Sequence, residues 1–570
     1  MKSETRTCIN CKQNFAIELD DFGFYEKIKV PPPTFCPECR LQRRLMWRNE
    51  RTFYRRQCDL CQKKIISTYH KEQPFPVYCQ KCWWGDKWDP YSYGVDFDFS
   101  KPFFEQYKAL LSRVPVLNMQ NDDGVGSVNS EYSQDFAFSK NCYLTSAGWY
   151  CDNVMYSYFT CYDKDILDSF TINNSERCYE CFESDRLFDS KYAILCFDSM
   201  DLSFCYDLRN CHNCFMCVGL RGKNYHIRNK PYTREAYFEQ LEKENLGNRI
   251  DFERCNKEFE TMVLKFPHRF AQIIKSPAST GDMLVHSKMS RDCFWSNNLE
   301  NSRYMIFIDG GKDCMDCNNS GNPSLCYEGV TPDNSYNGFF TIYCWKCSFD
   351  LYSFNCHSSS NIFGCIALKH GEYSILNKKY TKEEYEKLKI KIIDHMKKTG
   401  EWGEFFPPVV CPYGYNETLN IDFFPLKKEE AIKNGFNWKE EKEKNYSITL
   451  DSDKVPKNIS SVNEDILNQI IGCAHGGTCG HKCPVAFKVT ERELQFYKKM
   501  NIPIPVLCPN CRYYERLKWR NPAKLWHRQC MCEIENHNHR GKCLVEFETS
   551  YAPSRPEIVY CEKCYQQEAY

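Results

Sequence analysis

Residues 153–164 read NVMYSYFTCYDK, residues 165–176 read DILDSFTINNSE, and residues 177–188 read RCYECFESDRLF. These segments align without gaps at a period of 12 residues, which extends from Asn129 to Lys223. The first position of a unit is Asn or Asp in seven units of eight: Asn129, Asn141, Asn153, Asp165, Asp189, Asp201 and Asn213, with Arg177 as the exception. A fixed short period with aligned columns is typical of a β-solenoid, in which each unit buries its faces against its neighbours.

The units are rich in Tyr, Phe, Cys and Ser and poor in Ala, Glu and Lys, so we expect strands and not helices. Asn and Asp suit the corners because they tolerate left-handed backbone conformations. The predicted product is a parallel β-helix. One turn could take one unit or two, and the many aromatic side chains favour a wider turn of two units.

A second array with the same period begins at Asn301, and Asp350 indicates a one-residue bulge in its fifth unit. Both arrays end alike, with NCFMCVGLRGKNYHIRNKPYT at 213–233 and NIFGCIALKHGEYSILNKKYT at 361–381. A Thr and a helical pattern follow each of them, and Glu384 completes a capping box with Thr381. We expect these helices to cover the open ends of the arrays.

The chain has 570 residues, so several hydrophobic cores are expected. Its 75 basic and 75 acidic side chains cancel, which excludes a uniformly basic nucleic-acid binder and leaves only local patches. The first residues, MKSETRTCINCK, contain no apolar signal segment, and no run of 18 apolar residues occurs. We therefore expect a cytoplasmic protein without membrane association, whose 38 cysteines are metal ligands and reduced buried thiols.

Four C-x2-C pairs lie between residues 8 and 82, and two such pairs supply the four soft donors of a tetrahedral zinc site. A cross-braced arrangement is open, but the short gaps favour pairing in chain order. Because four thiolates leave no free coordination position, we expect structural zinc. In chain order the two sites are Cys8, Cys11, Cys36 and Cys39, and Cys58, Cys61, Cys79 and Cys82.

The end of the chain repeats this module at an offset of 472 residues: CPECRLQRRLMWRNERTFYRRQC at 36–58 aligns with CPNCRYYERLKWRNPAKLWHRQC at 508–530. Gly480 stands opposite Cys8, which leaves Cys479 or His481 as the fourth ligand of a third site. About four zinc ions are expected in all. The third site otherwise contains Cys483, Cys508 and Cys511, and the fourth contains Cys530, Cys532, Cys561 and Cys564, with Cys543 as a spare candidate.

Each module carries an arginine-rich segment with interleaved aromatic residues, and such segments can neutralise phosphates and stack on unpaired bases. RNA or DNA is therefore the leading predicted partner. The alternative is structural, with the arginines paired to Glu18, Asp20 and Asp21 or bonded to carbonyl groups of the cysteine knuckles. The predicted nucleic-acid contacts are Arg40, Arg43, Arg44, Trp47, Arg48, Arg55, Arg56, Arg512, Arg516, Trp519 and Arg520.

The predicted order is an amino-terminal double zinc-knuckle module (1–95), a first β-solenoid (96–233), a helical connector (234–300), a second β-solenoid (301–381), a capping helix with a linker (382–470) and a carboxyl-terminal double zinc-knuckle module (471–570). The fold class is thus mainly β, with two β-solenoid arrays flanked by duplicated zinc-ribbon or treble-clef modules and short capping helices.

The segment VPPPTFCPECRLQRRLMWRNERTFYRRQC, the following VYCQKCWWGDKWDPYSYG and their carboxyl-terminal counterpart resemble an uncharacterised family of large Cys-rich, zinc-ribbon-flanked repeat proteins predicted from ultrasmall uncultivated bacteria. The resemblance covers the whole chain. It implies a bacterial intracellular zinc protein and no particular activity, substrate or catalytic residue.

Three functions compete at this point. A zinc-binding scaffold that binds nucleic acid through its arginines is preferred, and a purely protein-binding scaffold is the alternative. A β-helix enzyme acting on carbohydrate is the third, with carboxylates drawn from Asp163, Asp165, Asp168, Glu180 and Glu183, although no spacing singles out a catalytic pair. The sequence contains no phosphate loop, nucleophile elbow or HExxH motif, and no small-molecule substrate is indicated.

Overall fold

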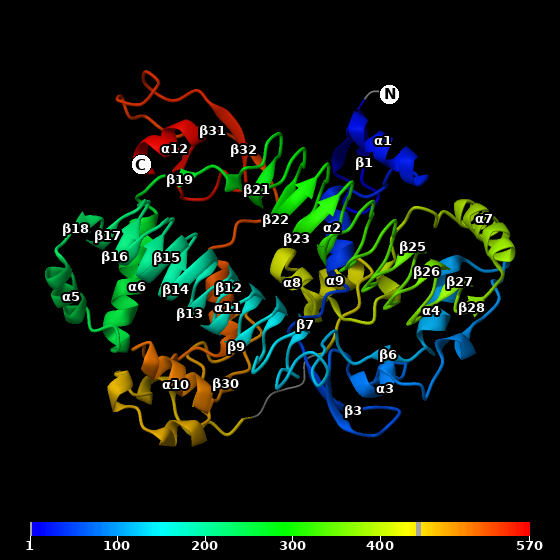
Figure 1. Ribbon diagram of the computed structural model, residues 1–570, viewed down its shortest axis with the longest axis horizontal. Helices are drawn as coiled ribbons and strands as arrows, with labels where there is room; N and C mark the ends of the chain where they lie inside the picture. Colours follow the sequence, from blue (N-terminus) through cyan, green and yellow to red (C-terminus); the bar gives the residue numbers. More distant parts are fainter. Residues whose placement is uncertain (1–2, 441–445, 570) are drawn as a thin grey trace.

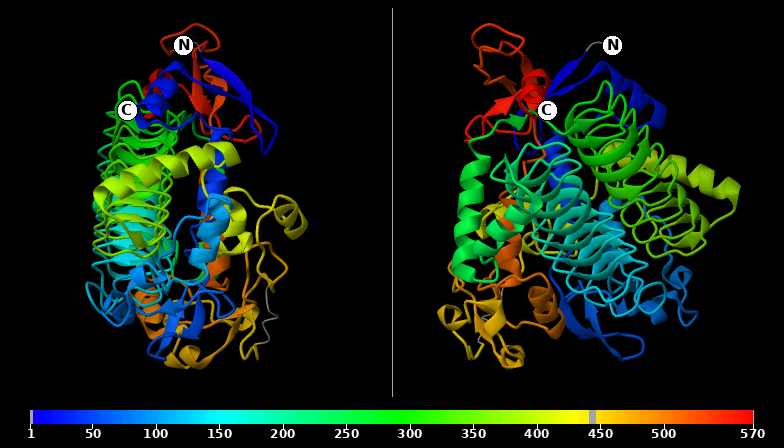
Figure 2. Two further views of the ribbon diagram at one scale, coloured as in Figure 1. Left: turned by 90° about the vertical axis from the view of Figure 1, so that its right-hand side faces the viewer. Right: turned by 60° about the vertical axis from the view of Figure 1, so that its left-hand side comes forward.

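The computed structural model describes residues 3–440 and 446–569. This part of the chain is mainly β, and parallel strands form two elongated arrays in the middle of the molecule (Figure 1). The cysteine modules and the helices lie around these arrays, and both chain ends lie at the same edge of the molecule (Figure 2).

In the first array (residues 134–227), neighbouring strands are one 12-residue unit apart. Tyr158 pairs with Ser146 on one side and with Phe170 on the other, both in parallel. Two units per turn would require an offset of 24 residues, so the expectation of two units is wrong. The strands are β7 (Gln134–Ala137), β8 (Ser146–Trp149), β9 (Asp152–Met155), β10 (Tyr158–Cys161), β11 (Lys164–Leu167), β12 (Phe170–Asn173), β13 (Glu176–Tyr179), β14 (Phe182–Ile194), β15 (Phe197–Tyr206), β16 (His212–Val218), β17 (Asn224–Ile227) and β18 (Lys230–Pro231).

A three-residue rhythm inside each unit explains this narrow spacing. Every third residue has a left-handed backbone, and all eight Asx-type marker positions, Arg177 included, belong to this set. The residue after each left-handed position is buried and mostly small, so a unit contributes four inward side chains, as in Val154, Ser157, Thr160 and Asp163. The interior is therefore filled by Cys, Ser, Ile and Leu, and aromatic rings are not needed there.

The aromatic side chains lie on the outer faces, where they stack along the array. The ring centroids of Tyr150 and Tyr162 lie 4.9 Å apart, and those of Phe170 and Phe182 also lie 4.9 Å apart. Because adjacent strands are about 4.8 Å apart, this stacking follows directly from the register. The rings need no wide interior, which removes the reason for expecting two units per turn.

The second array (residues 281–375) has the same offset, since Gly281 pairs with Cys293 and Ser360 with Glu372. It begins 20 residues before Asn301, inside the segment predicted as a helical connector, because its first units lack Asn or Asp markers. No bulge occurs at Asp350, which instead occupies a buried inward position paired with Ile362. The strands are β20 (Ile273–Ile274), β21 (Gly281–Val285), β22 (Cys293–Glu300), β23 (Ile306–Lys312), β24 (Asn318–Gly321), β25 (Ser348–Leu351), β26 (Ser360–Phe363), β27 (Glu372–Ile375) and β28 (Lys378–Lys379).

Helices follow both arrays, as predicted. The Thr233 hydroxyl accepts a hydrogen bond from the backbone of Ala236 at the start of α5 (Arg234–Lys243), and Thr381 and Glu384 form the expected capping box of α7 (Lys382–Thr399). α5 and α6 (Arg249–Val263) lie at the end of the first array, and α7 lies at the opposite end of the molecule, beside β27 and β28 (Figure 1).

The two arrays lie side by side and contact each other through outward side chains. The rings of Phe159 and Phe307 stack with their centroids 4.4 Å apart. The indole Nε1 of Trp295 also donates a hydrogen bond of 2.6 Å to Oε1 of Glu183. These contacts join one array to the other across a face that is buried in the molecule.

The cysteine modules are built from short hairpins and helices. In the amino-terminal half the elements are β1 (Glu4–Thr7), β2 (Asn14–Ile17), α1 (Leu19–Ile28), α2 (Pro37–Leu45), β3 (Tyr54–Gln57), β4 (Lys64–Ser67), β5 (Val77–Tyr78), α3 (Gln80–Trp84), α4 (Phe103–Leu111) and β6 (Val116–Leu117). In the remainder they are β19 (His268–Arg269), α8 (Asn420–Phe423), α9 (Lys428–Lys433), β29 (Ile471–Gly472), β30 (Ala486–Phe487), α10 (Glu491–Lys499), α11 (Pro509–Leu517), β31 (Trp526–Gln529), β32 (Glu546–Thr549), β33 (Val559–Tyr560) and α12 (Glu562–Ala569). Within the described ranges, no helix combines the length and the apolar character that crossing a membrane requires.

Candidate metal centres and arginine clamps

The first two cysteine groups have one architecture. Two cysteines lie in the turn of a β-hairpin, and two lie at the start of the following helix, where Cys36 caps α2 and Cys79 caps α3. The sulfurs of each group lie within 4.8 Å of one another, and the groups follow chain order. They are Cys8, Cys11, Cys36 and Cys39, and Cys58, Cys61, Cys79 and Cys82.

The spacing of the sulfurs fits a tetrahedral zinc ion. Zn–S bonds of about 2.3 Å place the corners of a regular tetrahedron about 3.8 Å apart. The Sγ atoms of Cys11 and Cys36 are 3.7 Å apart, and those of Cys61 and Cys79 are 3.8 Å apart. The two groups could therefore hold a metal without rearrangement.

Crowding of the thiols also shifts their pKa values. A hydrogen bond from the Cys39 side chain lowers the pKa of Cys36 to about 5, against the opposing effect of burial, and the same coupling raises the pKa of Cys39. In the second group, a backbone hydrogen bond involving Lys63 is the largest cause that lowers the pKa of Cys61 to about 7. Since the thiolate is the metal-binding form, these shifts favour ligation.

The third group contains a ligand that the sequence comparison missed. Its members are Cys473, Cys483, Cys508 and Cys511, so Cys473 takes the place for which Cys479 or His481 was predicted. Cys473 directly follows β29, as Cys8 follows β1 and Cys58 follows β3. The gap-free alignment missed it because Cys473 and Cys483 are 10 residues apart where Cys8 and Cys11 are three apart.

The fourth group is completed by the spare candidate. Cys543 joins Cys530, Cys561 and Cys564, and its Sγ lies 4.0 Å from that of Cys561. The predicted ligand Cys532 lies outside this group, and its Sγ is 3.1 Å from Nδ1 of His537. The hairpin between β31 and β32 is again longer than in the amino-terminal module, which displaces the second ligand along the chain.

The arginines of α2 do not face solvent. Arg40 Nε is 2.7 Å from Oδ2 of Asp316, and Arg43 Nη2 is 2.6 Å from Oε1 of Glu328, with all four side chains buried. Arg44 bridges the same two carboxylates at 3.2 and 3.3 Å. We call this cluster, formed by Arg40, Arg43, Arg44, Asp316 and Glu328, the first clamp. Next to it, Arg48 pairs with Glu50 and with Asp135 of the first array.

The arginines of α11 form an equivalent cluster on the first array. Arg512 Nε is 2.8 Å from Oδ2 of Asp168, and Arg516 Nη1 is 2.9 Å from Oε1 of Glu180. We call these four residues the second clamp. Arg512 corresponds to Arg40 at the offset of 472, and Asp168 and Glu180 each precede their counterparts in the first clamp by 148 residues. The amino-terminal module therefore clamps the second array, and the carboxyl-terminal module clamps the first.

This burial corrects the prediction that these arginines contact nucleic acid. Arg40, Arg43, Arg44, Arg48, Arg512 and Arg516 are buried, and Trp47 is 0% exposed between Phe354 and Phe406. The structural alternative holds in a changed form, because most partners are carboxylates of the arrays. Bonds to the knuckles also occur, from Arg40 to the carbonyl oxygen of Phe35 and from Arg512 to that of Leu507.

The remaining predicted contacts lie nearer the surface. Arg55 is exposed on β3, and Arg56 pairs with Asp59 at 2.7 Å. Arg520 lies over the ring of Phe423, and Trp519 is half-buried against Phe259. Of these residues, Arg55 alone is exposed, so they do not form a continuous basic surface.

The carboxylates considered for catalysis have structural surroundings. Asp168 and Glu180 belong to the second clamp, and Asp165 accepts a hydrogen bond from Asn153. Asp163 points into the array, where burial raises its pKa well above the usual range. Burial also raises the pKa of Glu183 to about 8, partly offset by the hydrogen bond from Trp295.

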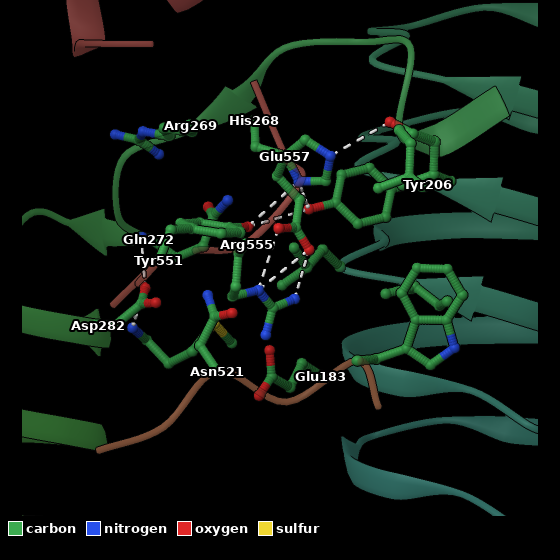
Figure 3. Close-up of a pocket in the computed structure, with 16 residues that line it drawn as sticks. Glu183, Tyr206, His268, Arg269, Gln272, Asp282, Asn521, Tyr551, Arg555 and Glu557 are labelled. Carbon is green, nitrogen blue, oxygen red and sulfur yellow. Dashed lines mark hydrogen bonds and ion pairs between the residues drawn. The ribbon is translucent and has the colours of Figure 1, made fainter. Parts of the chain in front are cut away.

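Glu183 lines a cavity between the first array and the last module (Figure 3). There Nδ1 of His268 lies 2.8 Å from the Tyr206 hydroxyl, and its Nε2 lies 3.2 Å from the Val263 carbonyl oxygen. Burial lowers the pKa of His268 to about 4, so its imidazole is neutral at pH 7. The cavity measures about 40 Å³, which is room for about three water molecules. A sugar ring does not fit in it.

No known family model matches the sequence, and no curated protein matches it. Among solved structures, a protein from Desulfovibrio desulfuricans G20 described as a "putative acetyltransferase" aligns with 47% of this chain and 80% of its own, at 10% identity and a TM-score of 0.09. A likeness at that score supports no conclusion about fold or activity.

Proposed function

We propose that this protein is a scaffold in which two β-solenoids with 12 residues per turn are held side by side by zinc-stabilised modules. The observation that carries the proposal is the pair of buried clamps, which direct the arginines of both modules into the arrays. The four groups of cysteines are compatible with zinc, and one structural ion in each is the occupancy that their closed, tetrahedral donor sets favour.

We further propose that the first array presents an aromatic ladder to a protein partner. The ladder consists of Phe138, Tyr150 and Tyr162, which are 54%, 50% and 61% exposed. Their rings are nearly parallel, with centroids 5.2 and 4.9 Å apart. Three adjacent exposed rings form an apolar strip of the kind that marks an interaction site.

An apolar protein segment suits this ladder better than a nucleic acid does. Stacking of a base requires a free ring face, and the central ring, Tyr150, has a neighbour on each face. The flanking column carries opposite charges in alternation, with Lys140 paired to Asp152 and Lys164 paired to Glu176. Such a column offers no surplus of positive charge to a phosphate backbone.

The test is capture of partners by the tagged, zinc-replete full chain, compared with the variant F138S/Y150S/Y162S. The matched control is Y336S/F349S, which removes two exposed rings of the second array that are 52% and 47% exposed. We expect a defined protein to be retained by the parent and the control after nuclease treatment and to be lost with the ladder variant. Loss of the partner on nuclease treatment would instead indicate nucleic acid, and equal retention by all three chains would exclude the ladder.

A further inference from the structure

We propose that the third cysteine group is one half of a dinuclear zinc centre, whose second ion shares the thiolate of Cys511. The proposal rests on zinc occupancy of the cysteine groups and adds an ion beyond one per group. The additional ligands come from the long turn between β29 and β30, which separates Cys473 from Cys483 and has no equivalent in the amino-terminal module.

The first ion would occupy a site with four sulfur ligands. The Sγ atoms of Cys473 and Cys511 are 3.8 Å apart, and those of Cys508 and Cys483 are also 3.8 Å apart. The backbone N–H of Cys508 donates to Sγ of Cys473 at 3.3 Å, as that of Cys79 donates to Sγ of Cys58 in the second group. This half of the centre therefore repeats the geometry of the simple groups.

The second ion would occupy a site with two sulfur and two nitrogen ligands. Its donor atoms also lie within 4.8 Å of one another, and they belong to His475, Cys479, His481 and Cys511. The Sγ atoms of Cys479 and Cys511 are 3.6 Å apart, close to the tetrahedral edge of about 3.8 Å. Cys511 is common to both sets, so its sulfur stands where two tetrahedra meet.

The histidines supply a second, independent observation. Nδ1 of His475 and Nδ1 of His481 are both buried and have no hydrogen-bond partner. Buried polar atoms are nearly always partnered, because an unsatisfied one costs about 1–3 kcal/mol. The ring of His481 is fixed by stacking on Tyr514, with centroids 5.1 Å apart and planes 17° apart. Coordination of a metal satisfies imidazole nitrogens that the protein itself leaves unpaired.

Charge balance favours two ions over one. Five thiolates gather in this module, from Cys473, Cys479, Cys483, Cys508 and Cys511, and a single Zn²⁺ neutralises only two of their five negative charges. Two Zn²⁺ ions neutralise four, and a bridging thiolate spreads its charge over both. Cys511 lies in the first turn of α11, where the helix dipole further stabilises negative charge. Both coordination spheres are closed, so the role of the centre is structural.

The sequence had offered Cys479 and His481 as rival fourth ligands of a single site. In the structure both belong to the second set, and the single site is already complete without them. The long turn therefore has a chemical explanation, because it brings three further donors to a sulfur that is already a ligand.

The experiment measures zinc per chain by elemental analysis of the purified full-length protein and of H475A/H481A. The double variant keeps all five cysteines, so we expect it to retain the parent's fold by circular dichroism and to contain one zinc fewer. The control H226A/H527A removes two histidines outside the centre and should match the parent. Equal zinc in parent and H475A/H481A overturns the second ion, whereas a parent without zinc would overturn the zinc assignment of the proposed scaffold as well.

A second measurement uses the unmutated chain and does not depend on the folding of any variant. After exchange of zinc for ¹¹³Cd, two cadmium resonances should show scalar coupling to each other, which requires a shared ligand atom. The remaining resonances should be uncoupled. A spectrum without a coupled pair would contradict the bridging role of Cys511.

Discussion

Arg40 Nε lies 2.7 Å from Oδ2 of Asp316, which is 276 positions further along the chain, and neither side chain is more than 1% exposed. The guanidinium of Arg40 also lies 5.1 Å from the ring centroid of Tyr304. Arg512, Asp168 and Tyr156 repeat this arrangement on the other array, where the guanidinium-to-ring distance is 5.2 Å. The molecule is thus held together by two equivalent clamps between segments that are remote in sequence.

Removing the shared carboxylate of the first clamp should destabilise the fold. D316N leaves the guanidinium groups of Arg40 and Arg44 buried beside a neutral amide, and loss of one partner from a buried pair costs about 3–5 kcal/mol. The measurement is the free energy of unfolding in urea. K27M, which removes the exposed pair between Lys27 and Asp313, should cost less than about 1 kcal/mol. A D316N chain as stable as K27M would contradict the clamp.

The second clamp should respond in the same way. D168N deprives Arg512 and Arg516 of their common partner, so its cost should also be about 3–5 kcal/mol. R43E/R44E/R48E, which replaces buried cations by like charges facing Glu328 and Asp135, should fail to fold. If that chain folds and loses only nucleic-acid binding, the structural role of these arginines is wrong.

The narrow interior of the arrays should not accept a large ring. Ala193 is an inward residue with 0% exposure, and A193F should cost about 1–3 kcal/mol or more because overpacking displaces the neighbouring units. Y192F is the matched control, since Tyr192 points outward and its ring stacks on Phe204 at 4.9 Å. Thermal unfolding distinguishes the two, and equal melting temperatures would refute the three-residue rhythm.

Glu183 should make stability depend on pH. Its pKa is raised by burial to about 8 in the folded chain, from 4.5, so its favourable contribution is complete below pH 4.5 and is lost as the pH rises through 8. E183Q keeps an acceptor for Trp295 but cannot ionise. The parent should therefore lose stability relative to E183Q between these values, by a few kcal/mol at most, and parallel stability curves would argue against a buried neutral acid.

Loss of one cysteine ligand should release one zinc. C36S removes a sulfur from the first group and should lower the zinc content by one ion per chain and loosen α2, which begins at that site. C142S is the control, because Cys142 is buried in the first array and donates to the carbonyl oxygen of Lys140. Unchanged zinc in C36S would remove the first group from the metal sites.

The sequence predicted the strands, the period and the helices after each array because these depend on local pattern. It missed the start of the second array, where Met289 occupies a position at which most units have Asn or Asp. The left-handed backbone at Met289 is imposed by its neighbours in the array and is not announced by its side chain. A small residue at every third position, as in Leu284, Ser287 and Ser290, was the signal that could have found these units.

The fate of the arginines could not be read from the sequence. Their charge was evident, but the carboxylates that neutralise it lie on units hundreds of residues away, and Asp316 and Glu328 stand at positions that resemble ordinary solvated corners. Cys473 was missed for a different reason, since a long insertion separates it from its partner ligand. In both cases a contact between remote segments decided the outcome.

The crossed arrangement of the clamps has a consequence for synthesis on the ribosome. The amino-terminal module emerges first, yet the carboxylate that receives Arg40 is made 276 residues later. At about 5–20 residues per second this takes roughly 14–55 s. A nascent chain must keep its first helix competent for docking during that interval, and early capture of a metal ion by Cys8, Cys11, Cys36 and Cys39 would let the module wait in a folded state.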